Sequence, residues 1–207
     1  MSGALTDDSI EAAPRGMSRF AFGLWIATVA SILVLLWQYD GTPGVAAVAP
    51  EHWPEGTRAV HLADRPTLLV TLDAYCPCSR ATVAQVEWVL VRTHARLAAT
   101  FLVEAPDGVR DEALAESPTY RLASAVVGAS VVRDHEGHDA ALFDAHTSGQ
   151  TYLYEPDGSL AFAGGLTWSR GHEGESVGRR ELLARLDQMP ASADRTAVFG
   201  CPLETSP

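Results

Sequence analysis

The most prominent feature of the hydrophobic pattern is an uninterrupted apolar run from Phe20 to Trp37 without a charged residue. About 18 apolar residues approach the shortest helix that spans the hydrocarbon core of a bilayer. Arginines precede the run and acidic residues follow it, so the positive-inside rule places the N-terminus in the cytoplasm. We predict a single-pass protein of the inner (cytoplasmic) membrane whose remaining chain is periplasmic or otherwise extracytoplasmic.

A cleaved signal peptide is the alternative interpretation of this run. Its hydrophobic region would be unusually long for a signal sequence. The Ala-x-Ala cleavage candidate, residues 47–49, lies far downstream and directly before Pro50. We therefore predict a retained anchor.

Composition divides the chain into four predicted segments. Residues 1–19 form a cytoplasmic tail, residues 20–39 the transmembrane anchor, and residues 40–60, rich in Gly, Ala and Pro, a linker. Residues 61–207 form the folded domain, which ends in a cysteine-containing tail. A domain of this size can bury a full hydrophobic core.

The domain opens with a strand–helix–strand pattern. Pro66 to Tyr75 is a short apolar run, as expected of a buried central strand. Apolar residues then recur at steps of three and four, which predicts one buried helix face: Val83, Val86, Leu90, Thr93 and Leu97. Ala98 to Glu104 predicts a second strand.

The rest of the domain alternates short helices and strands. A helix is predicted over Glu112–Val126, interrupted or restarted at Pro118, because proline cannot continue a helix from the preceding turn. The later elements are a strand at Ala129–Arg133, a helix at His138–Asp144, a hairpin of Thr151–Glu155 and Ser159–Gly164, and a helix at Glu181–Met189.

Composition and motifs exclude several classes of function. The formal net charge of −11 argues against nucleic acid as a partner, because phosphate binding needs a basic surface. The sequence contains no phosphate-binding Gly-rich loop, no Ser-nucleophile elbow and no haem-attachment C-x-x-C-H. Three cysteines are too few for a fold held together by several disulfides, so their spacing says more about function than their number does.

A parallel strand–helix–strand start, followed by a hairpin and a terminal helix, resembles the thioredoxin-like superfamily, an α/β fold with a central mixed sheet flanked by helices. Four segments look more narrowly like the bacterial RedB family: CPCSR, TSGQ, GGLTWSRGHEG and VFGCPL. The resemblance covers roughly Leu62 to Leu203. It implies a thioredoxin-like fold on a membrane anchor.

Cys76 lies between the first predicted strand and helix, in the sequence Cys76-Pro77-Cys78-Ser79. At such a junction, unpaired helix N–H groups and the helix dipole favour thiolate over thiol, which makes the sulfur a nucleophile. Pro77 suits the first helical turn, where its missing N–H costs nothing. The thioredoxin resemblance implies that Cys76 attacks and that Ser79 takes the place of the usual second cysteine.

Two cysteines are candidates for resolving a disulfide with Cys76. Cys78 is separated from Cys76 by one residue. A disulfide across that spacing closes a small strained ring, and a strained disulfide is readily transferred to a client. Cys201 is the alternative, if the C-terminal tail folds back over the site. The sequence leaves both open.

Client contacts are expected around the cysteines. Tyr75 falls where thioredoxins carry an aromatic residue, and Gln150 falls where they carry a cis-proline. The proline's absence leaves open a non-catalytic interaction module. The substrate-binding candidates are Tyr75, Pro77, Ser79, Gly149 and Gln150.

Copper binding is the other open alternative. Copper-delivery proteins of the Sco type also use the thioredoxin fold, with two cysteines and a distant histidine as ligands. Here Cys76 and Cys78 would bind Cu(I), with Cys201, His146 or His172 completing the set.

The function predicted first is that of a thiol–disulfide oxidoreductase without a cofactor. In it Cys76 attacks and Cys78 or Cys201 resolves. Its partners would be protein thiol or disulfide clients or a membrane redox partner.

Overall fold

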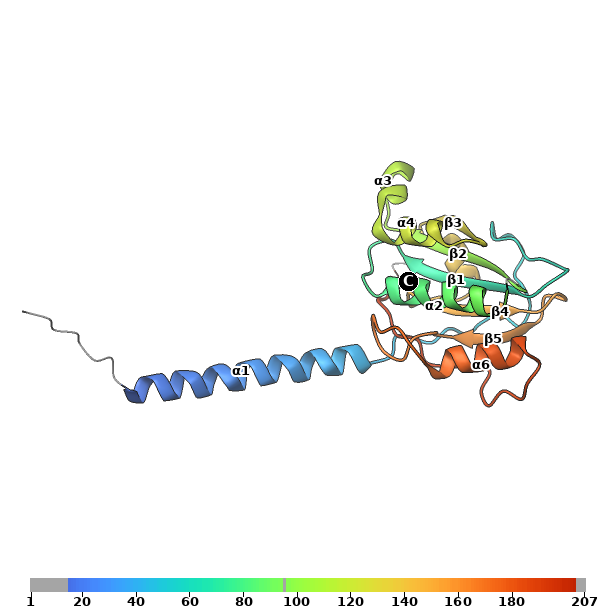
Figure 1. Ribbon diagram of the computed structural model, residues 1–207. Coiled ribbons are helices and arrows are strands. Elements are labelled where there is room, and N and C mark those ends of the chain that lie inside the picture. Colours follow the sequence, from blue (N-terminus) through green and yellow to red (C-terminus); the bar gives the residue numbers. More distant parts are fainter. Residues whose placement is uncertain (1–14, 95, 204–207) are drawn as a thin grey trace, which may run out of the picture. The chain divides into compact units, whose positions relative to one another are not determined.

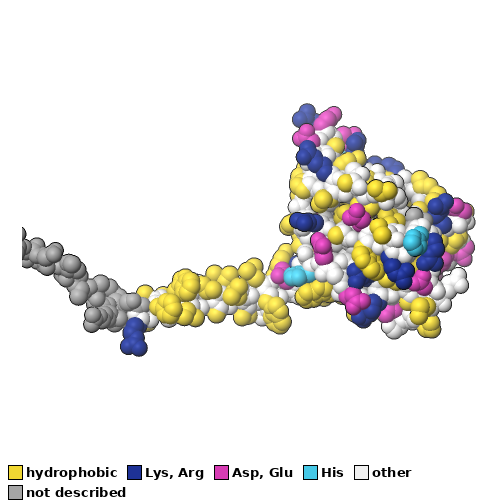
Figure 2. Space-filling view, viewed as in Figure 1, with side chains coloured by type: hydrophobic (Ala, Val, Ile, Leu, Met, Phe, Trp, Pro, Cys, Tyr) yellow, Lys and Arg dark blue, Asp and Glu magenta, His cyan; other side chains and the backbone are white. Residues whose placement is uncertain are grey.

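The computed structural model describes residues 15–94 and 96–203, which divide into two compact units at the boundary between Tyr39 and Asp40. Helix α1 (Arg15–Gly41) forms most of the first unit, and its span Arg19–Gly41 is long and apolar enough to cross a membrane. Hydrophobic side chains cover its visible surface (Figure 2). This helix is therefore consistent with an anchor or a signal sequence.

The second unit is built on a five-stranded mixed sheet (Figure 1). Its strands are β1 (Thr67–Asp73), β2 (Ala98–Ala105), β3 (Ala129–His135), β4 (Thr151–Tyr154) and β5 (Leu160–Gly164). They are ordered β3-β2-β1-β4-β5, with β1, β2 and β3 mutually parallel and β4 antiparallel to both β1 and β5. The predicted mixed α/β sheet is confirmed.

In the part of the unit that the structure describes, the sheet is accompanied by α2 (Ser79–Arg92), α3 (Asp111–Glu116), α4 (Pro118–Ala125), α5 (His138–Leu142) and α6 (Val177–Leu186). Side chains of α2, α4 and α6 cover one face of the sheet and form the first hydrophobic core with it. Side chains of α5 and of the segment after α1 cover the other face and form the second core. Strand β1 serves both cores, because Leu68 and Val70 join the first and Leu69 the second. Burial on both faces explains its continuous apolar run.

The boundaries of several helices differ from the predicted ones, and α5, for example, ends at Leu142 rather than Asp144. Helix α2 ends at Arg92, where the Thr93 hydroxyl donates to the Val89 carbonyl and His94 turns left-handed, so Leu97 is buried outside the helix. The predicted restart of the Glu112–Val126 helix at Pro118 is confirmed: α3 ends at Glu116, and α4 begins at Pro118 with Ser117 as its N-cap.

Helix α6 begins at Val177, four residues before the predicted start. The Ser176 hydroxyl accepts a hydrogen bond from the Arg179 amide and so caps its first turn. The helix ends at Leu186, before the predicted Met189.

The segment predicted as a linker packs against the domain. Ala47, Ala49 and Ala59 are buried in the second core, and His52 forms a β-bridge with Ser159. Arg58 is bonded through its backbone and side chain to the buried Asp139. Much of residues 40–60 is therefore part of the folded unit rather than a free spacer.

Candidate functional site

The site begins where β1 ends at Asp73. The Asp73 carboxylate accepts a hydrogen bond from the Tyr75 amide at 2.7 Å, and its backbone carbonyl accepts one from the Cys76 amide at 3.4 Å. The Ser79 amide then donates to the Cys76 carbonyl at 3.2 Å, which closes a turn. Pro77 lies inside this turn, before α2, and not in the first helical turn as predicted. Its fixed φ suits the second position of such a turn.

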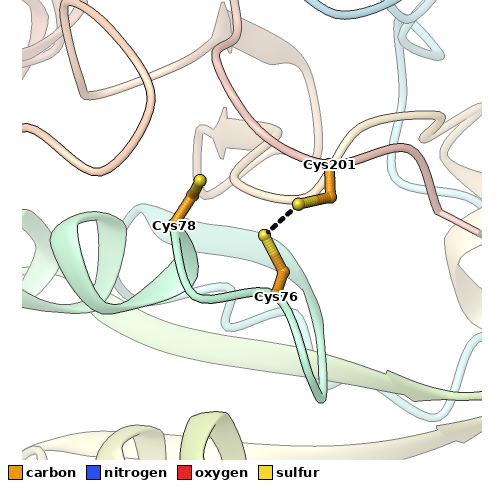
Figure 3. Close-up of side chains that lie close together, drawn as sticks. All are labelled: Cys76, Cys78 and Cys201. Atoms are coloured by element: carbon orange, nitrogen blue, oxygen red, sulfur yellow. Dashed lines mark hydrogen bonds between the residues drawn. The ribbon is translucent and has the colours of Figure 1, made fainter. Parts of the chain in front are cut away.

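Three thiols meet at this junction. The sulfur atoms of Cys76, Cys78 and Cys201 all lie within 4.8 Å of one another. Cys76 Sγ and Cys201 Sγ are in direct contact at 2.7 Å, with Cys78 set beside them on the turn into α2 (Figure 3). Both resolving candidates of the sequence are thus brought to Cys76, although Cys201 is 125 positions away.

Backbone pairing holds the tail that carries Cys201. We define the tail as Phe199–Leu203 and the docking edge as His146–Ser148. The Ser148 amide donates to the Cys201 carbonyl and the Leu203 amide to the His146 carbonyl, each at 2.9 Å. An antiparallel β-bridge joins Thr147 to Pro202 between them.

The surroundings of the three sulfurs give them different proton affinities. Burial raises the pKa of Cys76, but hydrogen bonds from the Cys201 side chain, the Cys201 and Cys78 amides and the Ser79 side chain outweigh it, so the net pKa is lowered. Burial, the hydrogen bond to Cys76 and the charge of Cys76 raise the pKa of Cys201 to about 12. Cys76 is therefore the more readily ionised sulfur of this pair, and Cys201 holds its proton more tightly.

Cys78 is held as a thiol. Burial and the negative charge of Cys76 raise its pKa, while the nearby guanidinium of Arg170 acts in the opposite direction. Cys78 is therefore less readily ionised than Cys76.

The predicted substrate-binding residues separate into exposed and buried ones. Tyr75 is 50 % exposed and Pro77 is exposed, so both flank the cysteines at the surface. Ser79, Gly149 and Gln150 are buried, as Cys76 itself is, and their role in client contact stays a prediction. Ser79 lies with its hydroxyl 3.0 Å from that of Ser148.

The two histidines of the alternative copper site lie outside the cysteine cluster. His146 pairs with Asp144 at 2.9 Å, and His172 with the Ser169 hydroxyl at 2.7 Å. Among the described residues, the group of metal-capable side chains at this site consists of the three cysteines alone. A soft metal ion here would therefore have three sulfur ligands and neither predicted histidine.

Two functional residues were missed by the sequence reasoning. Ser148 accepts a hydrogen bond from the Asp73 amide at 3.0 Å, and its amide holds Cys201, so it joins the strand end to the tail. Arg170 supplies positive charge near Cys78. Ser148 and Arg170 belong to TSGQ and GGLTWSRGHEG, in which the sequence analysis singled out other residues: Gly149, Gln150 and His172.

No protein-family profile and no curated protein matches the chain. An uncharacterized conserved protein from Geobacillus kaustophilus is similar in structure, with 16 % identity, a TM-score of 0.58, and 81 % of this chain and 98 % of that chain covered. A hypothetical protein from Sinorhizobium meliloti has 14 % identity and a TM-score of 0.55, with the same coverage of both chains. Together with the strand order, these likenesses show a thioredoxin-like α/β fold.

Proposed function

We propose that this chain is a membrane-tethered thiol–disulfide oxidoreductase in which Cys76 is the nucleophile and Cys201 the resolving cysteine. The contact of Cys76 Sγ with Cys201 Sγ at 2.7 Å carries the proposal. Sulfur atoms that meet in this way need only a small movement to form a disulfide bond of about 2.05 Å.

The reaction follows from the proton affinities of the pair. The Cys76 thiolate attacks one sulfur of a client disulfide, and the other client sulfur leaves as a thiolate. Cys201 then attacks Cys76 Sγ, its proton passes to the departing client sulfur, and the protein is left with a Cys76–Cys201 disulfide. The client gains two electrons from the protein and one proton from Cys201, and its first-released thiolate takes its proton from water.

Cys201 is favoured over Cys78 as the resolving residue for a geometric reason. Cys201 approaches from a separate segment, so its disulfide with Cys76 closes a long loop with freedom to reach the usual geometry. A Cys76–Cys78 disulfide would close a ring through one residue, Pro77, whose backbone angle is fixed. We assign Cys78 to the surroundings of the pair, where its amide donates to Cys76.

Cellular location and the narrower family are part of the same proposal. The apolar run Phe20–Trp37 of α1, with arginines before it, supports an anchor whose domain is extracytoplasmic, where disulfide chemistry is common. The segments CPCSR and VFGCPL support a RedB-like protein, and they include all three cysteines of the cluster.

Cu(I) binding is a second candidate, because one observation favours it. Three sulfurs within 4.8 Å of one another offer a soft ligand set suited to Cu(I). The two functions make opposite demands on Cys78, since a three-sulfur site needs it and a Cys76–Cys201 redox pair does not.

The test equilibrates the full chain in detergent with glutathione buffers of graded potential and counts thiols by alkylation and intact mass. We expect wild type and Cys78→Ser to exchange two electrons reversibly, and Cys76→Ser and Cys201→Ser to lose the transition. A reversible couple that survives Cys201→Ser but not Cys78→Ser would contradict the assignment. Cu(I) that binds stoichiometrically and is lost in Cys78→Ser, without any redox transition, would favour metal binding.

A further inference from the structure

The nucleophile is covered by the tail. Only 4 % of the Cys76 surface is exposed, and Cys201 Sγ occupies the position 2.7 Å from its sulfur. An incoming client sulfur needs that position to react. The tail must therefore move before Cys76 meets a client.

The tail is attached to the docking edge by bonds that another chain could make. The hydrogen bonds at His146 and Ser148 join backbone to backbone, and the Thr147–Pro202 bridge lies between them. Backbone pairing of this kind does not depend on sequence, so any extended segment can add to a free edge in the same way. Removal of the tail would leave the Ser148 amide and the His146 carbonyl unpaired beside Cys76.

Two positions in the tail add side-chain selectivity. A Cβ atom at Gly200 would lie 1.8 Å from the Ser148 carbonyl oxygen, so this close approach requires glycine directly before the cysteine. Leu203, two residues after Cys201, is buried in the second core. Pro202 between them is exposed. The pattern that fits the edge is therefore glycine, cysteine, any residue, then an apolar residue.

We propose that the docking edge binds an extended, cysteine-containing segment of the client, and that the tail is its intramolecular competitor. This inference rests on the proposed oxidoreductase function and identifies the class of its substrate. The client is a protein or peptide disulfide whose cysteine follows a glycine and precedes an apolar residue by two positions.

Competition for one edge couples resolution to release. The client disulfide displaces the tail and pairs with the edge, and the Cys76 thiolate attacks its docked sulfur while the other client sulfur leaves. When the tail pairs again, Cys201 attacks Cys76 Sγ and its proton passes to the docked client sulfur. The client departs reduced, and its other sulfur, released earlier as a thiolate, takes a proton from water. The same backbone pairing thus expels the client and closes the Cys76–Cys201 disulfide.

The test measures how fast Cys76 reacts with a peptide that copies the tail. The probe has the sequence Val-Phe-Gly-Cys-Pro-Leu, with its cysteine held as a mixed disulfide with thionitrobenzoate, whose release is read by absorbance. The protein is the reduced full chain in detergent carrying Cys78→Ser and Cys201→Ser, so that Cys76 is its sole thiol. Intact mass identifies the peptide adduct on Cys76.

Gly200→Ala lifts the tail from the edge without truncating the chain. We expect it to accelerate the reaction at least tenfold, while the control Ala197→Ser, at an exposed position just before the tail, stays within twofold. In the lifted protein, a probe with valine in place of its glycine should react at least tenfold more slowly. Equal rates with docked and lifted tail, or equal rates for the two probes, would overturn the inference.

A second variant and a second probe keep the outcome interpretable. Deletion of residues 199–207 removes the tail entirely and should act as Gly200→Ala does, in case the alanine variant unfolds. Glutathione disulfide reports on Cys76 without using the edge. If Cys76 reacts with glutathione disulfide but does not distinguish the two peptides, the docking proposal is overturned and the oxidoreductase function stands. If Cys76 reacts with no probe in any variant, the oxidoreductase function itself is overturned.

Discussion

Cys76 and Cys201 carry the same functional group, and their different proton affinities follow from their immediate neighbours. Backbone amides of Cys201 and Cys78 point at the Cys76 sulfur, and such donors favour its anion. Cys201 lies beside that anion, whose charge opposes a second one. One sulfur is thereby prepared to attack while its partner keeps the proton that the departing client needs.

The reactivity of Cys76 should reflect this difference. With Cys78→Ser as background, alkylation of Cys76 in the reduced protein should reach half its maximal rate below the ordinary thiol pKa of 9.0, and Cys201 should react only at much higher pH. Cys201→Ala should move the Cys76 midpoint upward, because it removes a hydrogen bond to the thiolate. Peptide mass spectrometry across a pH series measures both midpoints. An unchanged Cys76 midpoint in Cys201→Ala would contradict this account.

Ser148 should contribute to stability as well as to the position of the tail. Its buried hydroxyl accepts from the Asp73 amide at 3.0 Å, and Ser148→Ala leaves that N–H without this partner. We expect the free energy of unfolding to fall by about 1–3 kcal/mol. Denaturant titration measures the loss, with the exposed Ser124→Ala as control. Equal stability of the two variants would show that the hydroxyl is dispensable.

Part of the site could be predicted residue by residue. Cys76 was identifiable because a strand followed at once by Cys-Pro-Cys places a sulfur at a helix start. The choice between Cys78 and Cys201 was not accessible, because it depends on where the tail folds. The burial of Ser79, Gly149 and Gln150 was not accessible either, since these small and polar residues resemble surface residues in sequence.

At the scale of elements, the strands were easier to predict than the helix ends. Burial on both faces leaves a continuous apolar signal in β1 and β2, and their predicted limits agree closely with the structure. Helix ends depend on single capping residues, and Ser176 and Thr93 set limits that periodicity does not contain. The packed segment after α1 was missed because Ala and Pro are common to linkers and to close-packed extended chain.

Asp139 should stabilise the packing of the segment after α1 against the start of α5, because Thr57 and Arg58 of that segment donate hydrogen bonds to its carboxylate. Burial raises its pKa, but the Arg58 amide, the Thr57 hydroxyl and the Arg58 guanidinium outweigh burial and lower it. A carboxylate whose pKa is lowered on folding stabilises the protein above its unfolded pKa near 3.8, and this stabilisation is lost as the pH falls through the folded value.

We therefore expect Asp139→Asn to reduce the free energy of unfolding by about 1–3 kcal/mol at pH 7. Its difference from wild type should begin to shrink below about pH 4, where the unfolded carboxylate takes up a proton, and should be lost as the pH falls through the lower folded pKa. Denaturant titrations at several pH values test this, with the exposed Asp107→Asn as control. A difference that stays constant down to pH 3 would contradict a role for the negative charge.

At the scale of the whole molecule, the residues that the structure describes form one apolar helix and one domain of thioredoxin-like fold. The side of the membrane on which the domain lies decides which clients it can meet. The positive-inside rule predicts that the domain is outside the cytoplasm. A membrane-impermeant maleimide should then label the partly exposed Cys78 in intact spheroplasts expressing the reduced protein. Labelling that requires disruption of the membrane would place the domain in the cytoplasm instead.

The central claim is that Cys76 and Cys201 form the redox pair, and the most direct measurement is a disulfide map. The full chain is purified in detergent without reductant, alkylated, digested and analysed before and after reduction. The account predicts one disulfide-linked peptide pair that joins the Cys76 segment to the Cys201 segment, with Cys78 alkylated throughout. A Cys76–Cys78 disulfide with Cys201 alkylated, or three thiols that remain free after exposure to a mild oxidant, would contradict it.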